Sequence, residues 1–133
     1  MNKKTKRTLI RAFTQGDFEE LKVMMTDIKV MQSTGIRTIK TDTEIQDKLI
    51  SWIADDQIWC VESLESQECI GWVMLKVKDE NDPELGYMFK QSSWGQGHAT
   101  EVSKFLIDYG TKNLSYNRII AKCDFDNDAS INV

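Results

Sequence analysis

The sequence lacks the residue clusters that would hold a metal ion. It has one histidine, and its three cysteines (Cys60, Cys69 and Cys123) lie far apart without a CxxC pair. A structural zinc site takes four cysteine or histidine ligands, so we predict no metal. Isolated cysteines of this kind are typical of reduced, buried thiols in a cytoplasmic protein, and a cytoplasmic location is therefore expected.

Long apolar runs and an excess of positive charge are also missing. No stretch approaches the roughly 20 apolar residues that a membrane-spanning helix needs, and the basic segment 2–7 is not followed by the apolar region of a signal peptide. The formal net charge is -4, which argues against nucleic-acid binding through a broad basic face. With 133 residues, 41% of them hydrophobic and 29% charged, the chain is expected to form a single globular domain over residues 1–133.

The hydrophobic pattern predicts an α/β (α+β) fold with a mixed, mostly antiparallel sheet. Strand-like patterns occupy residues 8–13, 58–64, 69–77, 84–89 and 118–125. Segments 58–64 and 69–77 flank the polar stretch 65–68 and are expected to form a hairpin. Helical spacing predicts helices over 14–28, from Thr43 onward, and after Gly97, with a loop over 31–41.

Two of these helices have a predicted start and a predicted buried face. Thr43 and Gln46 fit a capping box, and the residues expected on the buried face of that helix are Ile45, Leu49, Trp52 and Ile53. The face expected for the last helix consists of Ala99, Val102, Leu106 and Tyr109.

Two glycines one residue apart, Gly95 and Gly97, mark the start of the last helix. The first amides of a helix have no partner within it and carry about half a positive charge. Small residues such as Gly97 and Ala99 let an anion approach these amides closely. A nucleotide P-loop is excluded because no Lys-Ser or Lys-Thr pair follows the glycines. A Rossmann fingerprint is excluded because Thr100 stands at its third glycine and the preceding strands pattern as hairpins.

The stretch WGQGHATE (94–101) resembles the pyrophosphate loop of the GCN5-related N-acetyltransferases, the GNAT superfamily. It is most similar to the RimJ/RimL-like branch, in which Trp replaces the usual Arg or Gln; His98 stands where that branch commonly has Tyr. Further segments match in order: TKRTLIRAFTQGDFEEL (5–21), CIGWVML (69–75), ELGYMF (84–89) and NRIIAKCDFDNDAS (117–130). The resemblance implies a GNAT fold and transfer of an acetyl group from acetyl-CoA to a primary amine within a ternary complex.

The resemblance also implies roles for individual residues. The cofactor-binding residues are expected to act mainly through their backbone, and they are Met88, Phe89, Gln96, Gly97, His98, Ala99 and Thr100. The Asn127 side chain would bind near the pantetheine arm, and Ser130 would protonate the leaving thiolate. Glu84 would draw the proton from the amine through a water molecule. Other interpretations remain: Glu84 as a solvated strand-edge carboxylate, and the segment 126–130 as a polar turn and helix cap.

Compared with the family pattern, the sequence ends before one further helix and two strands. We therefore expect an incomplete domain with an exposed apolar strand near 118–123. This could reflect a truncated gene, a homo-oligomer that covers the strand, or a former enzyme that still binds the cofactor. The alternative function is thus a non-catalytic CoA-binding or interaction module, and a third is an interaction protein without a ligand. The acceptor could be a protein N-terminus, a polyamine, an antibiotic or another small amine.

Overall fold

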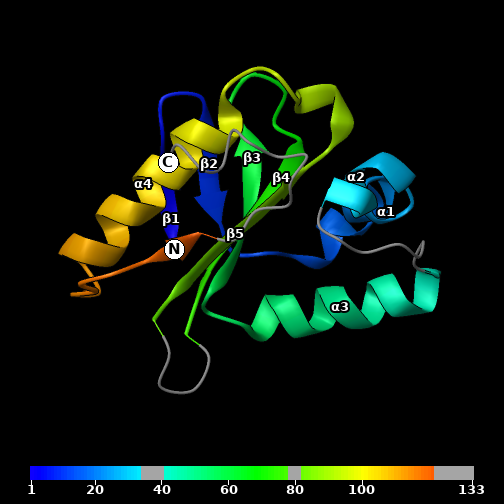
Figure 1. Cartoon of the computed structure of the whole chain (residues 1–133). Coiled ribbons are helices and arrows are strands. Elements are labelled where there is room, and N and C mark those ends of the chain that lie inside the picture. Colours follow the sequence, from blue (N-terminus) through cyan, green and yellow to red (C-terminus); the bar gives the residue numbers. More distant parts are fainter. Residues whose placement is uncertain (34–40, 78–81, 122–133) are drawn as a thin grey trace.

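The computed structural model describes residues 1–33, 41–77 and 82–121. Within these ranges the strands form one sheet in the order β1-β2-β3-β4-β5-β6 (Figure 1). Neighbouring strands are antiparallel except β5 and β6, which are parallel. The strand bounds are Asn2–Lys4, Thr8–Arg11, Ile58–Ser63, Cys69–Lys76, Glu84–Phe89 and Ile120–Ala121. This confirms the predicted mixed, mostly antiparallel sheet.

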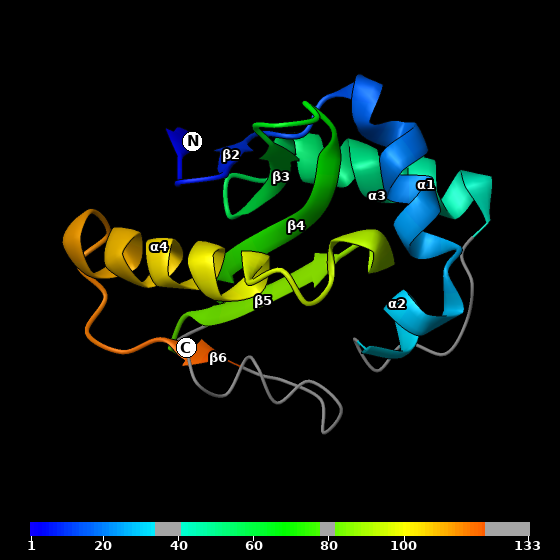
Figure 2. The same cartoon turned by 90° about the horizontal axis from the view of Figure 1, so that it is seen from above.

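Helices cover both faces of the sheet. Helices α1, α2 and α3 lie on one side and α4 on the other (Figures 1 and 2). Their bounds are Phe18–Met25, Ile28–Ser33, Asp42–Ala54 and His98–Lys112. Single 3-10 turns precede α1 and α4, at Gln15–Asp17 and Gln91–Ser93. Among the described residues, none of the helices combines the length and the apolar character that crossing a membrane requires.

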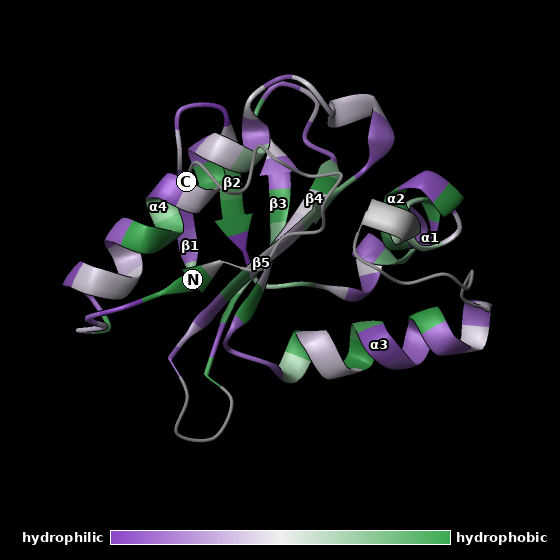
Figure 3. Cartoon of the chain, in the orientation of Figure 1, coloured by the Kyte–Doolittle hydropathy of each residue, from purple (hydrophilic) through white to green (hydrophobic). Residues whose placement is uncertain are grey.

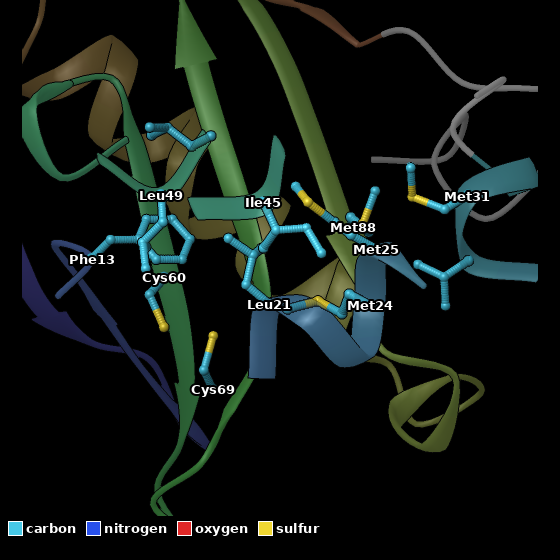
Figure 4. Packing of buried hydrophobic residues seen from close by; sticks show 12 residues of the cluster. Phe13, Leu21, Met24, Met25, Met31, Ile45, Leu49, Cys60, Cys69 and Met88 are labelled. Atoms are coloured by element: carbon cyan, nitrogen blue, oxygen red, sulfur yellow. The ribbon is translucent and has the colours of Figure 1, made fainter. Parts of the chain in front are cut away.

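Two hydrophobic clusters hold these layers together. Side chains alternate between the faces of a strand, so Cys60 faces α1 and α3 whereas its neighbour Val61 faces α4. The central strands carry long hydrophobic stretches, while the helices mix hydrophobic and polar residues (Figure 3). Figure 4 shows the first cluster, where Leu21 of α1 packs beside Ile45 of α3.

The predicted buried faces of α3 and α4 are largely confirmed. In α3, Ile45 and Leu49 are fully buried and Trp52 packs against them, but Ile53 is 36% exposed. In α4, Val102 and Leu106 are fully buried. The prediction for Ile53 is wrong because it lies toward the edge of the apolar stripe, at the last turn of the helix.

The first predicted helix, over 14–28, corresponds to a 3-10 turn followed by α1, and its last residue, Ile28, already begins a second helix, α2. The Thr26 hydroxyl donates to a carbonyl in the last turn of α1 at 2.7 Å. The Asp27 carboxylate accepts a first-turn N–H of α2 at 2.9 Å, as a capping side chain does. These bonds end one helix and start the next. The predicted loop over 31–41 is therefore wrong as far as Ser33, where α2 ends.

The capping box of α3 lies two residues earlier than predicted. Thr41 accepts the Glu44 N–H at 3.2 Å, and the Glu44 carboxylate accepts the Thr41 N–H at 3.1 Å. The pair Thr43 and Gln46 matches the same pattern, but an ionised glutamate is the stronger acceptor and suits the positive end of a helix better. Strand β1 was not predicted at all, because its three residues are exposed and polar.

Candidate functional site

The start of α4 is open to an anion. Gly97 is the N-cap residue with φ 81° and ψ 8°, and Gly95 has φ 75°. This left-handed backbone favours glycine, which explains both residues. The first bond of the helix runs from the Glu101 N–H to the Gly97 carbonyl at 3.0 Å, and Gly97 contributes no side-chain cap. By helix geometry the amides without a partner in the helix are those of Gly97, His98, Ala99 and Thr100.

The segment before α4 is held by its own side chains. The Trp94 indole Nε1 donates to the Phe89 carbonyl at 2.9 Å, and the Gln96 amide donates to the Ser92 carbonyl at 3.1 Å. The Gln96 side chain thus folds back onto the loop, and Trp94 ties the loop to the end of β5. Both contacts fix the loop conformation before any ligand arrives.

The His98 side chain packs against Phe89 next to the loop before α4. Its side chain is 9% exposed and its ring stacks on Phe89, with centroids 6.2 Å apart and planes 22° apart. Its Nε2 lies 3.3 Å from the Gln96 side-chain oxygen. Burial lowers the pKa of His98, and the nearby charge of Arg7 lowers it further, although Glu101 opposes this. His98 therefore packs on Phe89, and its lowered pKa favours the neutral ring.

Glu101 fixes the start of α4 to the opposite end of the chain. Its Oε1 accepts from the Arg7 Nε at 2.8 Å, and its Oε2 accepts the Arg7 backbone N–H at 3.0 Å and the Thr5 hydroxyl at 2.6 Å. Burial by itself raises the pKa of Glu101, but the hydrogen bonds from Thr5 and Arg7 outweigh it, so the pKa lies below its ordinary value. Nothing in the sequence predicts this contact, because Arg7 and Glu101 are 94 residues apart.

We expect Glu101→Gln to lower the free energy of unfolding by about 1–2 kcal/mol at pH 7, because charged hydrogen bonds are lost. The contribution of a carboxylate with a lowered pKa is present above its ordinary pKa and is lost as the pH falls through its folded-state pKa. Urea unfolding at pH 7, and at steps below pH 5, should therefore show the two proteins converging in acid. The exposed carboxylate of Asp108, which forms an ion pair with Lys112 at 3.7 Å, provides the control Asp108→Asn, which should change little. A difference that stays constant down to pH 3 would contradict the role of Glu101.

A pocket of about 570 Å³ adjoins this helix start. The β1–β2 turn, the β3–β4 turn and the segment between β5 and α4 contribute its walls. Three cationic side chains line it: Lys6, Arg7 and Lys90. Carboxylates position two of them, since Arg7 bonds Glu101 and the Lys90 ammonium lies 2.9 Å from Glu20. The carboxylates Glu65 and Glu68 also line the pocket, so its charge is mixed. The feature that suits a phosphate group is the set of unpartnered amides at the start of α4 beside it.

The outer edge of β5 is the second part of the site. The Lys90 N–H donates to the Ile70 carbonyl of β4 at 2.9 Å. Because successive residues of an antiparallel strand turn their backbone groups to opposite sides, Phe89 and Tyr87 present theirs away from β4. The Trp94 bond to the Phe89 carbonyl agrees with this direction. Within the described residues, β6 pairs with β5 only at its start.

The backbone groups of Met88 point in the opposite direction to those of Tyr87 and Phe89. The same alternation turns its backbone groups toward β4, where it pairs with Trp72, and its side chain is 3% exposed in the cluster of Figure 4. Of the two residues expected to bind the pantetheine arm by backbone, Phe89 presents its backbone at the open edge and Met88 does not. Tyr87, which sequence reasoning did not name, also presents its backbone at this edge, and strand alternation is the signal that could have found it.

One of the predicted catalytic residues, Glu84, lies away from the helix start. Glu84 begins β5, so it stands at the other end of that strand from Phe89, roughly 17 Å along the backbone, and it pairs with Ile120. It is half-buried. Asn127 and Ser130 lie outside the described residues. The structure thus brings together the loop residues but leaves Glu84 apart from them.

One group among the described residues has the composition of a metal site, namely Asp17, Cys60 and Cys69. Both oxygens of Asp17 already accept from the Arg11 guanidinium, at 2.9 and 2.8 Å. The Thr14 N–H adds a third bond at 2.8 Å. A cation there would have to displace a guanidinium, so this group is an ion pair beside two thiols.

Comparison with known proteins identifies the family. Residues 7–133 match the family model described as the acetyltransferase (GNAT) domain. The chain belongs to the GNAT acetyltransferase family. The GNAT fold that the resemblance implied is therefore confirmed.

The sequence relatives match this chain over different fractions of their own length. The Bacillus subtilis protein YkkB is 32% identical over 79 residues, which are 57% of this chain and 46% of YkkB. The N-acetyltransferase p20 of Bacillus licheniformis is 39% identical over 69 residues, which are 50% of this chain and 39% of p20. These matches span less than half of the two relatives. The N-acetyltransferase YnaD of Bacillus subtilis is 28% identical over 131 residues, which are 97% of this chain and 76% of YnaD.

Solved GNAT structures superpose over almost the whole chain. An acetyltransferase from Bacillus anthracis has a TM-score of 0.88 and 25% identity, covering 99% of this chain and 79% of that one. A spermidine N-acetyltransferase from Vibrio cholerae, in complex with CoA and spermine, has a TM-score of 0.77 at 16% identity, covering 95% and 76%. The second likeness is one of fold alone.

Proposed function

We propose that the chain is an acetyl-CoA-dependent N-acetyltransferase of RimJ/RimL-like type that acts on a primary amine. The observation that carries this proposal is the start of α4. There, backbone amides without a side-chain cap follow Gly97, beside a pocket lined by three cationic side chains and by the carboxylates Glu65 and Glu68. Such amides favour a phosphate group, and membership of the GNAT family supports coenzyme A as the molecule that carries it.

Two surfaces of the chain would hold acetyl-CoA. The amides of Gly97, His98, Ala99 and Thr100 and the Gln96 backbone would bind the pyrophosphate, with Lys6 and Arg7 close by. The outward backbone groups of Tyr87 and Phe89 would pair with the pantetheine arm as an added strand does. Asn127 is proposed to complete this contact. When bound, acetyl-CoA supplies a thioester whose carbonyl carbon the amine attacks.

Acetyl transfer requires two proton transfers, and residues of the chain are proposed to carry them out. A lysine-like amine has a pKa near 10.4 and an α-amine near 8, so an acceptor of either kind must lose a proton before it attacks. Glu84 is proposed to accept that proton through a water molecule. Ser130 is proposed to give a proton to the thiolate that leaves. No covalent acyl-enzyme is needed, since both substrates are held together.

A primary amine is the acceptor class that these arguments support. The formal net charge of -4 favours a cationic acceptor over an acidic one. A spermidine N-acetyltransferase shares the fold, which supports a polyamine among the candidates, beside a protein N-terminus and other small amines.

Turnover with acetyl-CoA and a panel of amines tests this function. The panel should include a polyamine, an aminoglycoside, and peptides with free N-termini, with released thiol as the signal. We expect saturable turnover with at least one amine, and a fall in kcat of about 10²- to 10⁴-fold for Glu84→Gln at neutral pH. Asp82→Asn is the matched control, because Asp82 is a surface carboxylate of the same segment paired with Arg118 at 3.6 Å.

Each possible result distinguishes the proposed function from a different alternative. Acetyl-CoA binding without turnover of any amine would favour the non-catalytic CoA-binding module. An unchanged kcat for Glu84→Gln would remove Glu84 as the base while leaving the transferase function standing. Failure to bind acetyl-CoA at all would contradict the proposal.

A further inference from the structure

Two buried cysteines face each other across neighbouring strands. Cys60 of β3 is fully buried and Cys69 of β4 is 2% exposed, and both are free thiols. Their sulfur atoms lie within 4.8 Å of each other and of an Asp17 oxygen. Figure 4 shows the two sulfur atoms turned toward one another. Nothing in the proposed acetyl transfer uses these thiols.

A β-bulge creates this arrangement. Val61 pairs with Gly71, but the next residue, Glu62, pairs with Cys69, so Ile70 is an extra residue in β4. In a regular ladder two adjacent residues face opposite sides. The extra residue returns Cys69 to the face that carries Cys60 and leaves Ile70 among the residues that pack against α4. The bulge thus places both thiols in the same cluster.

We propose that Cys60 and Cys69 are an oxidation site at which a peroxide converts the two thiols into a disulfide between β3 and β4. The Cys69 thiolate attacks one peroxide oxygen, the O–O bond breaks, and water leaves after protonation, so that Cys69 becomes a sulfenic acid. Cys60 then loses its proton and its sulfur attacks the Cys69 sulfur. The S–O bond breaks, a second water leaves and the S–S bond forms. Two thiols and one hydrogen peroxide give one disulfide and two waters, and the two electrons pass to the peroxide.

The order of the two steps follows from position. Cys69 comes directly after the exposed turn 64–68, so local opening of the hairpin end uncovers it first. Cys60 lies in the middle of β3 with no exposed surface. Its hydrogen bond to Cys69 and its burial also raise the pKa of the Cys60 thiol, which makes it the slower nucleophile and the resolving partner.

The disulfide would stiffen the hairpin next to the β5–α4 loop. The residue after Cys69, Ile70, accepts the Lys90 N–H at 2.9 Å, and Lys90 begins the segment that leads to α4. Closing the short loop between the two cysteines restricts the unfolded chain. The oxidised protein should therefore melt roughly 5 °C higher than the reduced one. This inference stands whether or not the chain is a transferase.

The test uses full-length protein with Cys123→Ala, so that the only thiols left are those of the pair. The native protein is treated with hydrogen peroxide, then alkylated and weighed by mass spectrometry. We expect the loss of two hydrogens without alkylation, a cross-linked peptide containing Cys60 and Cys69, and a melting temperature that dithiothreitol returns to its reduced value.

A further Cys69→Ala change in the same background provides the control, and it should show neither the cross-link nor the rise in melting temperature. If peroxide instead leaves both thiols open to alkylation after denaturation, the proposal is wrong. Oxidation of each cysteine separately to a sulfinic acid, or cross-links between molecules only, would also overturn it.

Discussion

Replacing Gly97 by glutamine is expected to abolish measurable acetyl-CoA binding while the protein remains folded. Gly97 has φ 81°, which costs a residue with a side chain about 1–2 kcal/mol. A Cβ there would lie 3.4 Å from an Arg7 Nη2, beside the uncapped amides of α4. The longer side chain would therefore occupy the space in which a phosphate approaches those amides. Calorimetric titration with acetyl-CoA, and with CoA for comparison, measures the effect.

Gly95→Gln is the matched control for this substitution. Gly95 has a similar φ of 75°, but a Cβ there would meet nothing within 4 Å. Both variants should thus lose a similar amount of stability, and only Gly97→Gln should lose binding. Equal binding by the two variants would show that the anion does not sit at the helix start. Loss of binding in both would point to the backbone conformation of the whole loop and not to space at Gly97.

Removing the carboxylate of Asp17 is expected to cost about 3 kcal/mol in the free energy of unfolding. Asp17 is 5% exposed and binds the Arg11 guanidinium with both oxygens. Asp17→Ala leaves part of a guanidinium without its partner in a poorly solvated place and also frees the Thr14 N–H. Burial raises the pKa of Asp17, but the bonds from Arg11 and Thr14 outweigh it and the pKa is lowered.

Urea unfolding of Asp17→Ala at pH 7 gives this cost directly. Glu62→Ala is the control, because Glu62 is the second carboxylate on Arg11, at 3.0 Å, with a side chain that is 21% exposed. It makes one bond to the guanidinium where Asp17 makes two, so we expect a loss below about 1 kcal/mol. A loss for Asp17→Ala no larger than that for Glu62→Ala would mean that Arg11 is solvated without Asp17.

The local parts of this structure could be predicted from the sequence. Strands β3, β4 and β5 follow from hydrophobic alternation because each is half or fully buried along its length. The start of α4 follows from Gly97, since a left-handed N-cap needs a residue without a side chain. Both features depend on residues that are neighbours in the chain, and a sequence displays such neighbours directly.

The features that could not be predicted depend on residues that are distant in the chain or that follow no hydrophobic pattern. The contact between Arg7 and Glu101 joins the two ends of the described chain, and neither residue stands out in its own segment. The bulge at Ile70 changes the face of Cys69, and the adjacent Gly71 is its one local mark, since a glycine inside a strand pattern can indicate a bulge. The break between α1 and α2 depends on the Thr26 and Asp27 side chains, which are as common in helix caps as in exposed helix faces.

The anchoring of α4 by Glu101 also has a consequence for how the protein folds. Strands β3, β4 and β5 form a meander of sequence neighbours, and such local contacts require little loop closure. The Glu101 contact closes a loop of 94 residues, so it belongs with the contacts that are expected to form late. The central sheet would thus assemble first, and the helix start that we propose as the cofactor site would take its final shape only when the N-terminal segment meets α4.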